Sequence, residues 1–182
     1  MAYMMRRNIA RDGAVVQQAS HSRVRLNSGQ PLPAGTVPPF VFRLDAEIEG
    51  GGVMPTLFDI PTLIARRVFI ELLQANGVDN LEVVEAAIRN PLTGDTITDY
   101  AYVNIIGLVA AASLEHSETS ELGEDVRLVD NPVLVSASSV APFRLFRLAE
   151  DPRRIIIDNR LADAIRASQF DDIYLKELGA IE

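Results

Sequence analysis

Apolar residues recur at helical spacing in one segment of this chain, between Pro61 and Asn76. They fall at i, i+3, i+4, i+7 and i+8, with polar residues on the opposite stripe. Pro61 suits the first position of a helix because its φ is fixed, and Gly77 suits the position just past the end. The pattern predicts one long helix packed on a sheet. Its buried face would be formed by Ala65, Val68, Phe69, Leu72 and Leu73.

Extended apolar runs follow this helix. A β-branched segment at 81–88, a dense turn signal at 90–95 and a long apolar run at 97–110 together predict a hairpin. Residues 100–109 are apolar on both alternating faces, which is typical of a central strand covered on both sides. We therefore expect the middle of the sheet to be buried.

The C-terminal third alternates between further strand and helix patterns. Strands are predicted at 133–136, 143–148 and 154–157, and Asp158 is a good N-cap for a short helix through 167. A last strand is predicted at 173–178. Strand, helix and strand in succession can form a right-handed crossover onto one sheet.

The first 52 residues carry few periodic patterns and many breakers, such as Pro31, Gly35 and Pro38. We expect a loop-rich N-terminal part with short edge strands at 3–5, 23–26 and 40–44, followed by a turn at Gly50, Gly51 and Gly52. Residues 53–182 would form the regular core of a single domain, 1–182. The predicted fold is α+β: a mixed, largely antiparallel sheet, one long helix packed on it and a C-terminal strand-helix-strand unit.

Composition supports a folded chain, because 48% of its 182 residues are apolar and 23% are charged. Cysteine is absent, which excludes disulfides, thiolate metal sites and a cysteine nucleophile and fits a reducing cytosol. The N-terminus has no signal-peptide pattern, and the apolar run at 103–114 is too short for a bilayer that needs about 20 residues. A cytoplasmic location is expected.

The net charge of −8 lies entirely in the second half of the chain. Residues 1–90 hold 9 basic and 9 acidic side chains, whereas 91–182 hold 8 and 16. Such a surface disfavours nucleic acid and membranes and favours a basic protein partner, although the charge could also serve solubility alone. The segment 115–130 has a net charge of −5, with Arg127 as its one basic residue. It is a solvated loop or a partner-binding surface, and the candidate binding residues are Glu115, Glu118, Glu121, Glu124, Asp125 and Asp130.

No pattern of catalytic, cofactor-binding or metal-ligating residues emerges. His21 and His116 lie in different predicted loops without zinc-site spacing. The serine-rich segment 136–139 lacks the Gly-x-Ser-x-Gly pattern of a nucleophile elbow and is predicted to be a loop. Gly94 and the triple glycine lack the spacing of a phosphate-binding loop. The adjacent acidic pairs at 124–125 and 171–172 would point to opposite faces of a strand. We therefore expect a protein that is not an enzyme and holds no cofactor.

Apolar patterning along residues 55–178 resembles one known family. The segments that carry the resemblance are 58–63 (FDIPTL), 102–106 (YVNII), 143–148 (FRLFRL), 155–158 (IIID), 161–165 (LADAI) and 173–178 (IYLKEL). They resemble family eleven of the immunity proteins of bacterial polymorphic toxin systems. In that family a glycine-containing turn commonly precedes the last strand, where this chain has 169–172 (QFDD).

The resemblance implies a small cytoplasmic protein, made beside a toxin gene, that binds the toxin domain and neutralises it by steric and electrostatic occlusion. It brings no catalytic residues. A nuclease with a basic groove would complement the acidic surface, and the protein would act as a monomer or a homodimer. Two alternatives remain open: a non-catalytic adaptor or chaperone for a secreted effector, and an enzyme whose scattered residues form no motif.

Overall fold

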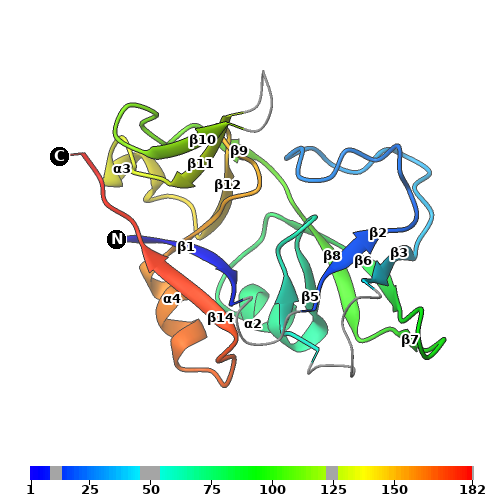
Figure 1. Ribbon diagram of the computed structural model, residues 1–182. Coiled ribbons are helices and arrows are strands. Elements are labelled where there is room, and N and C mark those ends of the chain that lie inside the picture. The colour runs from blue at the N-terminus through cyan, green and yellow to red at the C-terminus, as the bar shows by residue number, and fades with distance from the viewer. Residues whose placement is uncertain (9–13, 46–53, 122–126, 182) are drawn as a thin grey trace.

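Strands dominate the fold of this protein, as a computed structural model shows for residues 1–8, 14–45, 54–121 and 127–181 (Figure 1). The strands are β1 Ala2–Arg7, β2 Val16–Gln18, β3 Phe40–Leu44, β4 Leu57–Phe58, β5 Ile64–Arg66, β6 Leu81–Arg89, β7 Thr96–Ile97, β8 Tyr100–Ile105, β9 Leu108–Val109, β10 Glu118–Glu121, β11 Arg127–Asn131, β12 Leu145–Leu148, β13 Ile155–Asp158 and β14 Ile173–Glu177. The helices are α2 Arg67–Ala75, the single turn α3 Ala137–Val140 and α4 Asn159–Arg166.

A five-stranded sheet has the order β14-β1-β13-β12-β9. β1 runs antiparallel to both β13 and β14, and α4 connects these two parallel strands across it, so the expected strand-helix-strand unit is present. Asp158 caps α4 as predicted, since its carboxylate accepts a hydrogen bond from the Leu161 amide at 2.8 Å.

A curled, seven-stranded half-barrel follows the order β2-β3-β6-β8-β5-β4, with β7 also paired to β6. The first half of β6 pairs with β8, whereas its second half pairs with β3 on one side and β7 on the other. All six residues of β8 are buried, which confirms the predicted central strand. The predicted turn at 90–95 joins β6 to β7, and Gly94 adopts a φ of +79° there.

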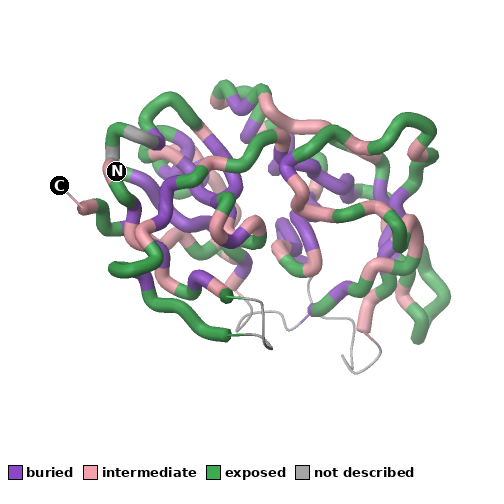
Figure 2. Tube along the Cα trace, turned by 90° about the horizontal axis from the view of Figure 1, so that it is seen from above, coloured by how far each residue is buried: buried purple, intermediate pink, exposed green. Residues whose placement is uncertain are grey.

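One apolar core joins the two large sheets. Tyr3 and Met5 from β1 and Ile155 from β13 pack in the same cluster as Ala101 and Val103 from β8. Helices α2 and α4 contribute Phe69 and Leu161, among others, to this cluster. Figure 2 shows buried residues, in purple, in both the left and the right part of the molecule. The third sheet is the small hairpin β10–β11, which lies at the margin of the molecule (Figure 1).

The prediction of one long helix is wrong. Helix α2 has nine residues and begins at Arg67, because residues 64–66 form β5, which pairs with β8 and β4. Leu63, Ile64 and Ala65 are fully buried, so tertiary pairing outweighs the local helical signal. The predicted C-terminal end of the helix is confirmed, since Gly77 follows it with a φ of +82°. Val68, which was predicted to be buried, is 54% exposed. The fold is therefore mostly β, with two large mixed sheets and one small antiparallel hairpin.

The predicted edge positions of the N-terminal strands are also wrong. β1 and β3 are interior strands, each paired on both sides. Residues 23–26 form turns instead of a strand. The loop that contains them is tied to the half-barrel, since Asn104 donates to the Gln30 carbonyl at 2.8 Å. Gly29 lies so close to β9 that a Cβ there would stand 2.6 Å from the Leu108 Cγ.

Two other segments differ from the sequence-based prediction. The apolar run at 97–110 is divided into β7, β8 and β9, with Gly107 at a φ of +93° between the last two. Residues 133–136 form no strand, although Leu134 makes isolated bridges to Ala112 and Ala180. Within the described residues, no helix has the length and apolar character needed to cross a membrane.

Candidate interaction surface

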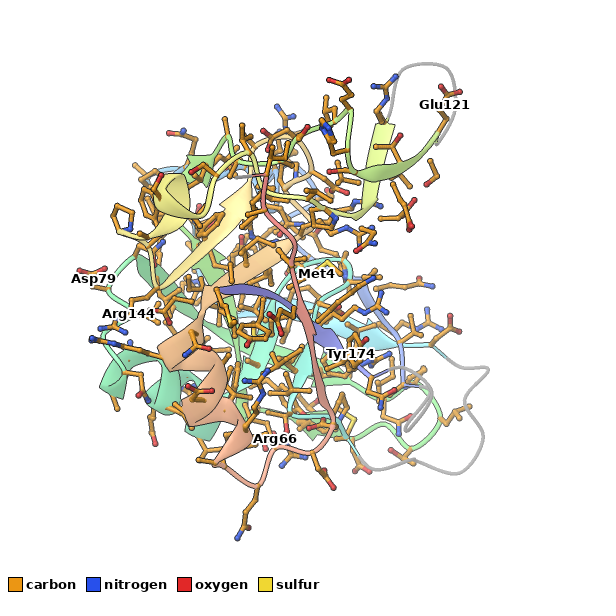
Figure 3. The ribbon with its side chains drawn as sticks, turned by 90° about the vertical axis from the view of Figure 1, so that its left-hand side faces the viewer. Met4, Arg66, Asp79, Glu121, Arg144 and Tyr174 are labelled. Atoms are coloured by element: carbon orange, nitrogen blue, oxygen red, sulfur yellow. The ribbon has the colours of Figure 1, made fainter. Side chains whose placement is uncertain are left out.

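The acidic segment predicted to bind a partner forms a hairpin instead of a loop. β10 and β11 pair antiparallel, with an irregularity between Glu118 and Thr119. All four side chains of β10 are exposed. Figure 3 shows Glu121 at the outer end of this hairpin. We call β10 and β11 the acidic hairpin.

The structure brings together only part of the predicted set. Glu115, Glu118 and Glu121 are exposed, and no ion pair joins any of them to a cation among the described residues. Glu124 and Asp125 lie outside the described residues. Asp130 differs, because its Oδ1 lies 3.0 Å from Nη2 of Arg154. Glu118 and Glu121 therefore remain the best-defined binding candidates, whereas Asp130 has a structural role.

Arg154 fixes the base of the acidic hairpin to the turn between β12 and β13. Besides Asp130, its guanidinium contacts the Val129 carbonyl at 2.5 Å and the Asp151 carboxylate at 3.4 Å. Asp151 also accepts a hydrogen bond from the Val129 amide at 3.0 Å. The hairpin thus projects from a rigid base, and its carboxylates point into solvent.

Asp151 stays charged although its side chain is only 3% exposed. Burial alone would raise its pKa, but hydrogen bonds from the Arg153 side chain and the Val129 amide outweigh this effect and lower the pKa. Arg153 lies 2.5 Å from the carboxylate. This anchor was not predicted from the sequence, although the Asp-Pro-Arg-Arg run at 151–154 is a recognisable charged turn.

Both histidines have serine partners in the structure. Nδ1 of His21 lies 2.7 Å from Ser20 Oγ, and Nε2 lies 2.8 Å from the Val37 carbonyl. His21 also stacks on Phe40 with ring centroids 4.3 Å apart, so it fixes the loop before β3. His116 makes a similar local contact with Ser113 at 2.9 Å. Each pair spans at most three positions along the chain and fits the closing of a local turn.

The remaining motifs occupy ordinary structural positions or cannot be placed. Ser136 caps the single turn α3 by accepting from the Ser138 amide at 3.2 Å, so the segment predicted as a loop is partly helical. Asp172 accepts a hydrogen bond from the Thr56 amide at 2.5 Å. The triple glycine at 50–52 lies outside the described residues. No cluster of three or more potential metal ligands occurs among the residues that the structure describes.

Comparison with known proteins leaves the family of this chain open. No protein-family model matches it, and no curated protein matches it in sequence.

Proposed function

We propose that this protein is an immunity protein that binds and neutralises a bacterial toxin domain. The acidic hairpin carries the proposal, since it holds exposed carboxylates on a projecting arm with a fixed base. Charges on such an arm steer a cationic partner and accelerate association. The resemblance in apolar patterning adds support, because its last four segments coincide with β12, β13, α4 and β14.

The partner best suited to this arm is a toxin domain whose active surface is basic, as in a nuclease. Carboxylates of Glu118 and Glu121 would take the places that phosphate groups occupy on such a surface. Neutralisation would follow from occlusion, and it requires no chemistry from this chain. We further propose that the protein acts in the cytoplasm, has no enzymatic activity, needs no cofactor and binds neither nucleic acid nor membranes.

The first experiment is co-expression with the toxin domain that this proposal expects to be encoded immediately upstream of the gene, scored by cell survival and by co-purification. Survival together with a stable complex is the expected result. A complex without rescue would instead support the alternative function, an adaptor or chaperone for a secreted effector. Death without a complex, despite soluble expression of this chain, would contradict the proposed function for that toxin.

A charge-reversal pair tests the role of the acidic hairpin. Glu118→Lys with Glu121→Lys should lower the association rate constant about tenfold at low salt and weaken its dependence on salt. The matched control is Glu71→Lys with Asp79→Lys, which makes the same change of charge at exposed residues elsewhere. Figure 3 shows Asp79 far from Glu121. Equal rates for both double variants would remove the hairpin from the interface.

A further inference from the structure

The outer edge of β14, in the five-stranded sheet, pairs with no other strand among the described residues. β14 is the last strand in the order, and its five residues are in continuous register with β1. The other terminal strand of this sheet, β9, has two residues, and the ends of the half-barrel, β2 and β4, have three and two. Natural sheets commonly keep edge strands short or cover them, so β14 stands out among the edge strands of the two large sheets.

Hydrogen bonds at the two ends of β14 show which backbone groups face outward. The Leu178 amide donates to the Ala2 carbonyl at 3.0 Å, and the Asn8 amide donates to the Asp172 carbonyl at 2.9 Å. Even-numbered residues therefore bond to β1. Because backbone groups alternate along a strand, the amides and carbonyls of Ile173, Leu175 and Glu177 point away from the sheet.

The chain itself pairs with the continuation of this edge. Beyond β14, the Leu134 amide donates to the Gly179 carbonyl at 2.9 Å, and the Ile181 amide donates to the Leu134 carbonyl at 2.9 Å. The segment around Leu134 thus already pairs with backbone groups that point outward on the same side of the chain as those of β14. Leu134 follows β11 closely in the chain, so the open part of the edge is continuous with the base of the acidic hairpin.

A cavity of about 320 Å³ lies beside the open edge. β14 lines it with Ile173 and Leu175, whose side chains share one face of the strand, and α4 and the turn after it add Ile165, Arg166 and Phe170. A strand added at the edge would place alternate side chains over this same face. Proteins that bind extended peptides commonly combine these two features: a strand edge that forms main-chain hydrogen bonds and a cavity beside it that holds a side chain.

We propose that the toxin domain binds this protein partly by adding an extended segment to β14, with one of its side chains in the adjoining cavity. This inference rests on the proposed function, because it assigns the second contact surface of the same partner. The outward backbone groups define the occupant as a polypeptide in extended conformation. Apolar Ile165, Phe170 and Leu175 line the cavity together with polar Arg166, Ser168 and Asp171, so it suits a side chain with an apolar stem.

Glu177 offers a sharp test because its amide faces outward and its side chain is exposed. Glu177→Pro removes that donor and blocks close approach of a strand, yet it breaks no bond to β1. Glu177→Ala is the matched control, since it removes the same side chain and keeps the amide. The Pro variant should bind the upstream toxin domain about tenfold more weakly than the Ala variant. Equal affinities would overturn strand addition.

Amide hydrogen exchange on the wild-type protein gives an independent readout. In the free protein, the Leu175 and Glu177 amides should exchange fast, and the Tyr174 and Lys176 amides, bonded to β1, slowly. On binding of the upstream toxin domain, exchange at Leu175 and Glu177 should slow at least about tenfold. A complex that leaves both amides unprotected would overturn strand addition and leave the proposed function standing. The absence of any complex would reject both.

Discussion

Arg147 has the lowest exposure, 0%, among the charged side chains that the structure describes. Nη1 donates to the Pro152 carbonyl at 2.7 Å, but Nε and Nη2 have no hydrogen-bond partner among the described residues. Burial lowers the pKa of Arg147 to about 10, against the opposing effects of Tyr102 and Asp59. The Arg147 side chain fills space in the core, but burying its charge with two unpaired nitrogen atoms costs free energy.

Replacing Arg147 separates its volume from its charge. Arg147→Met keeps most of the volume and removes the buried donors, so the free energy of unfolding should stay equal or rise by ~1–3 kcal/mol. Arg147→Ala leaves a cavity and should lower it by ~2–4 kcal/mol. Urea denaturation at neutral pH measures both. A Met variant as unstable as the Ala variant would show that the guanidinium itself stabilises the fold.

Tyr102 makes stability depend on pH in alkaline solution. Burial raises its pKa to about 12, although Arg147 and a hydrogen bond with Thr62 act in the opposite direction. Above pH 10 the unfolded chain loses the phenol proton while the folded protein keeps it, so stability falls as pH rises from 10 to 12. One such phenol removes ~1.3 kcal/mol between pH 9 and pH 11.

Tyr102→Phe should therefore lose ~1 kcal/mol less stability than the wild type between pH 9 and pH 11. Urea titrations at the two pH values give this difference within each protein, so any effect of the substitution at pH 9 cancels. An identical loss in both proteins would contradict a raised pKa at this phenol.

At the scale of elements, the acidic hairpin depends on one arginine at its base. Arg154→Met removes the contacts to Val129 and Asp130 and leaves Asp151 with Arg153. Amides of β10 and β11 should then exchange at least about tenfold faster, whereas those of β13 should change little. Hydrogen exchange followed by mass spectrometry resolves both segments.

The matched control for the hairpin is Arg153→Met. It removes a charge from the same turn but breaks no hydrogen bond to the described residues of β11, since the Arg153 side chain contacts the Asp151 carboxylate. Equal exchange of the hairpin in the two variants would show that Arg154 is not its anchor.

Local signals in the sequence predicted element ends better than element types. Asp158, Gly77 and Gly94 mark the ends and turns at which they were expected, because capping and positive φ depend on a few neighbouring atoms. The helical pattern before Arg67 failed because β8 pairs with residues 64–66. The sequence of the acidic hairpin did not predict strands, because all side chains of β10 are exposed and apolar residues do not alternate with polar ones there.

At the scale of the whole molecule, the N-terminal strand holds the fold together. β1 lies between β13 and β14, partners more than a hundred residues away in the chain. No local pattern encodes such a pairing, which explains why β1 was expected at an edge. The exposed carboxylates were identified from charge alone, whereas the open edge of β14 required knowledge of the strand order.

The shared core predicts that the two large sheets unfold together. Met5 is 2% exposed and packs in the cluster that contains residues of both sheets. It is paired with Ile155 on one side and Leu175 on the other. Met5→Ala should therefore lower the free energy of unfolding by ~2–4 kcal/mol. Because the core is common, slow amides of β8 in the half-barrel should lose as much protection as those of β13.

Native-state hydrogen exchange at increasing denaturant measures this loss residue by residue. Arg6→Ala is the control in the same strand, since Arg6 is exposed and its guanidinium lies over the Tyr174 ring at 5.1 Å. It should leave both sheets within about 0.5 kcal/mol of the wild type. If Met5→Ala weakened β13 while β8 kept its protection, the sheets would be separate folding units. β14, and the acidic hairpin that Arg154 ties to the turn before β13, would then belong to the unit that Met5→Ala destabilises.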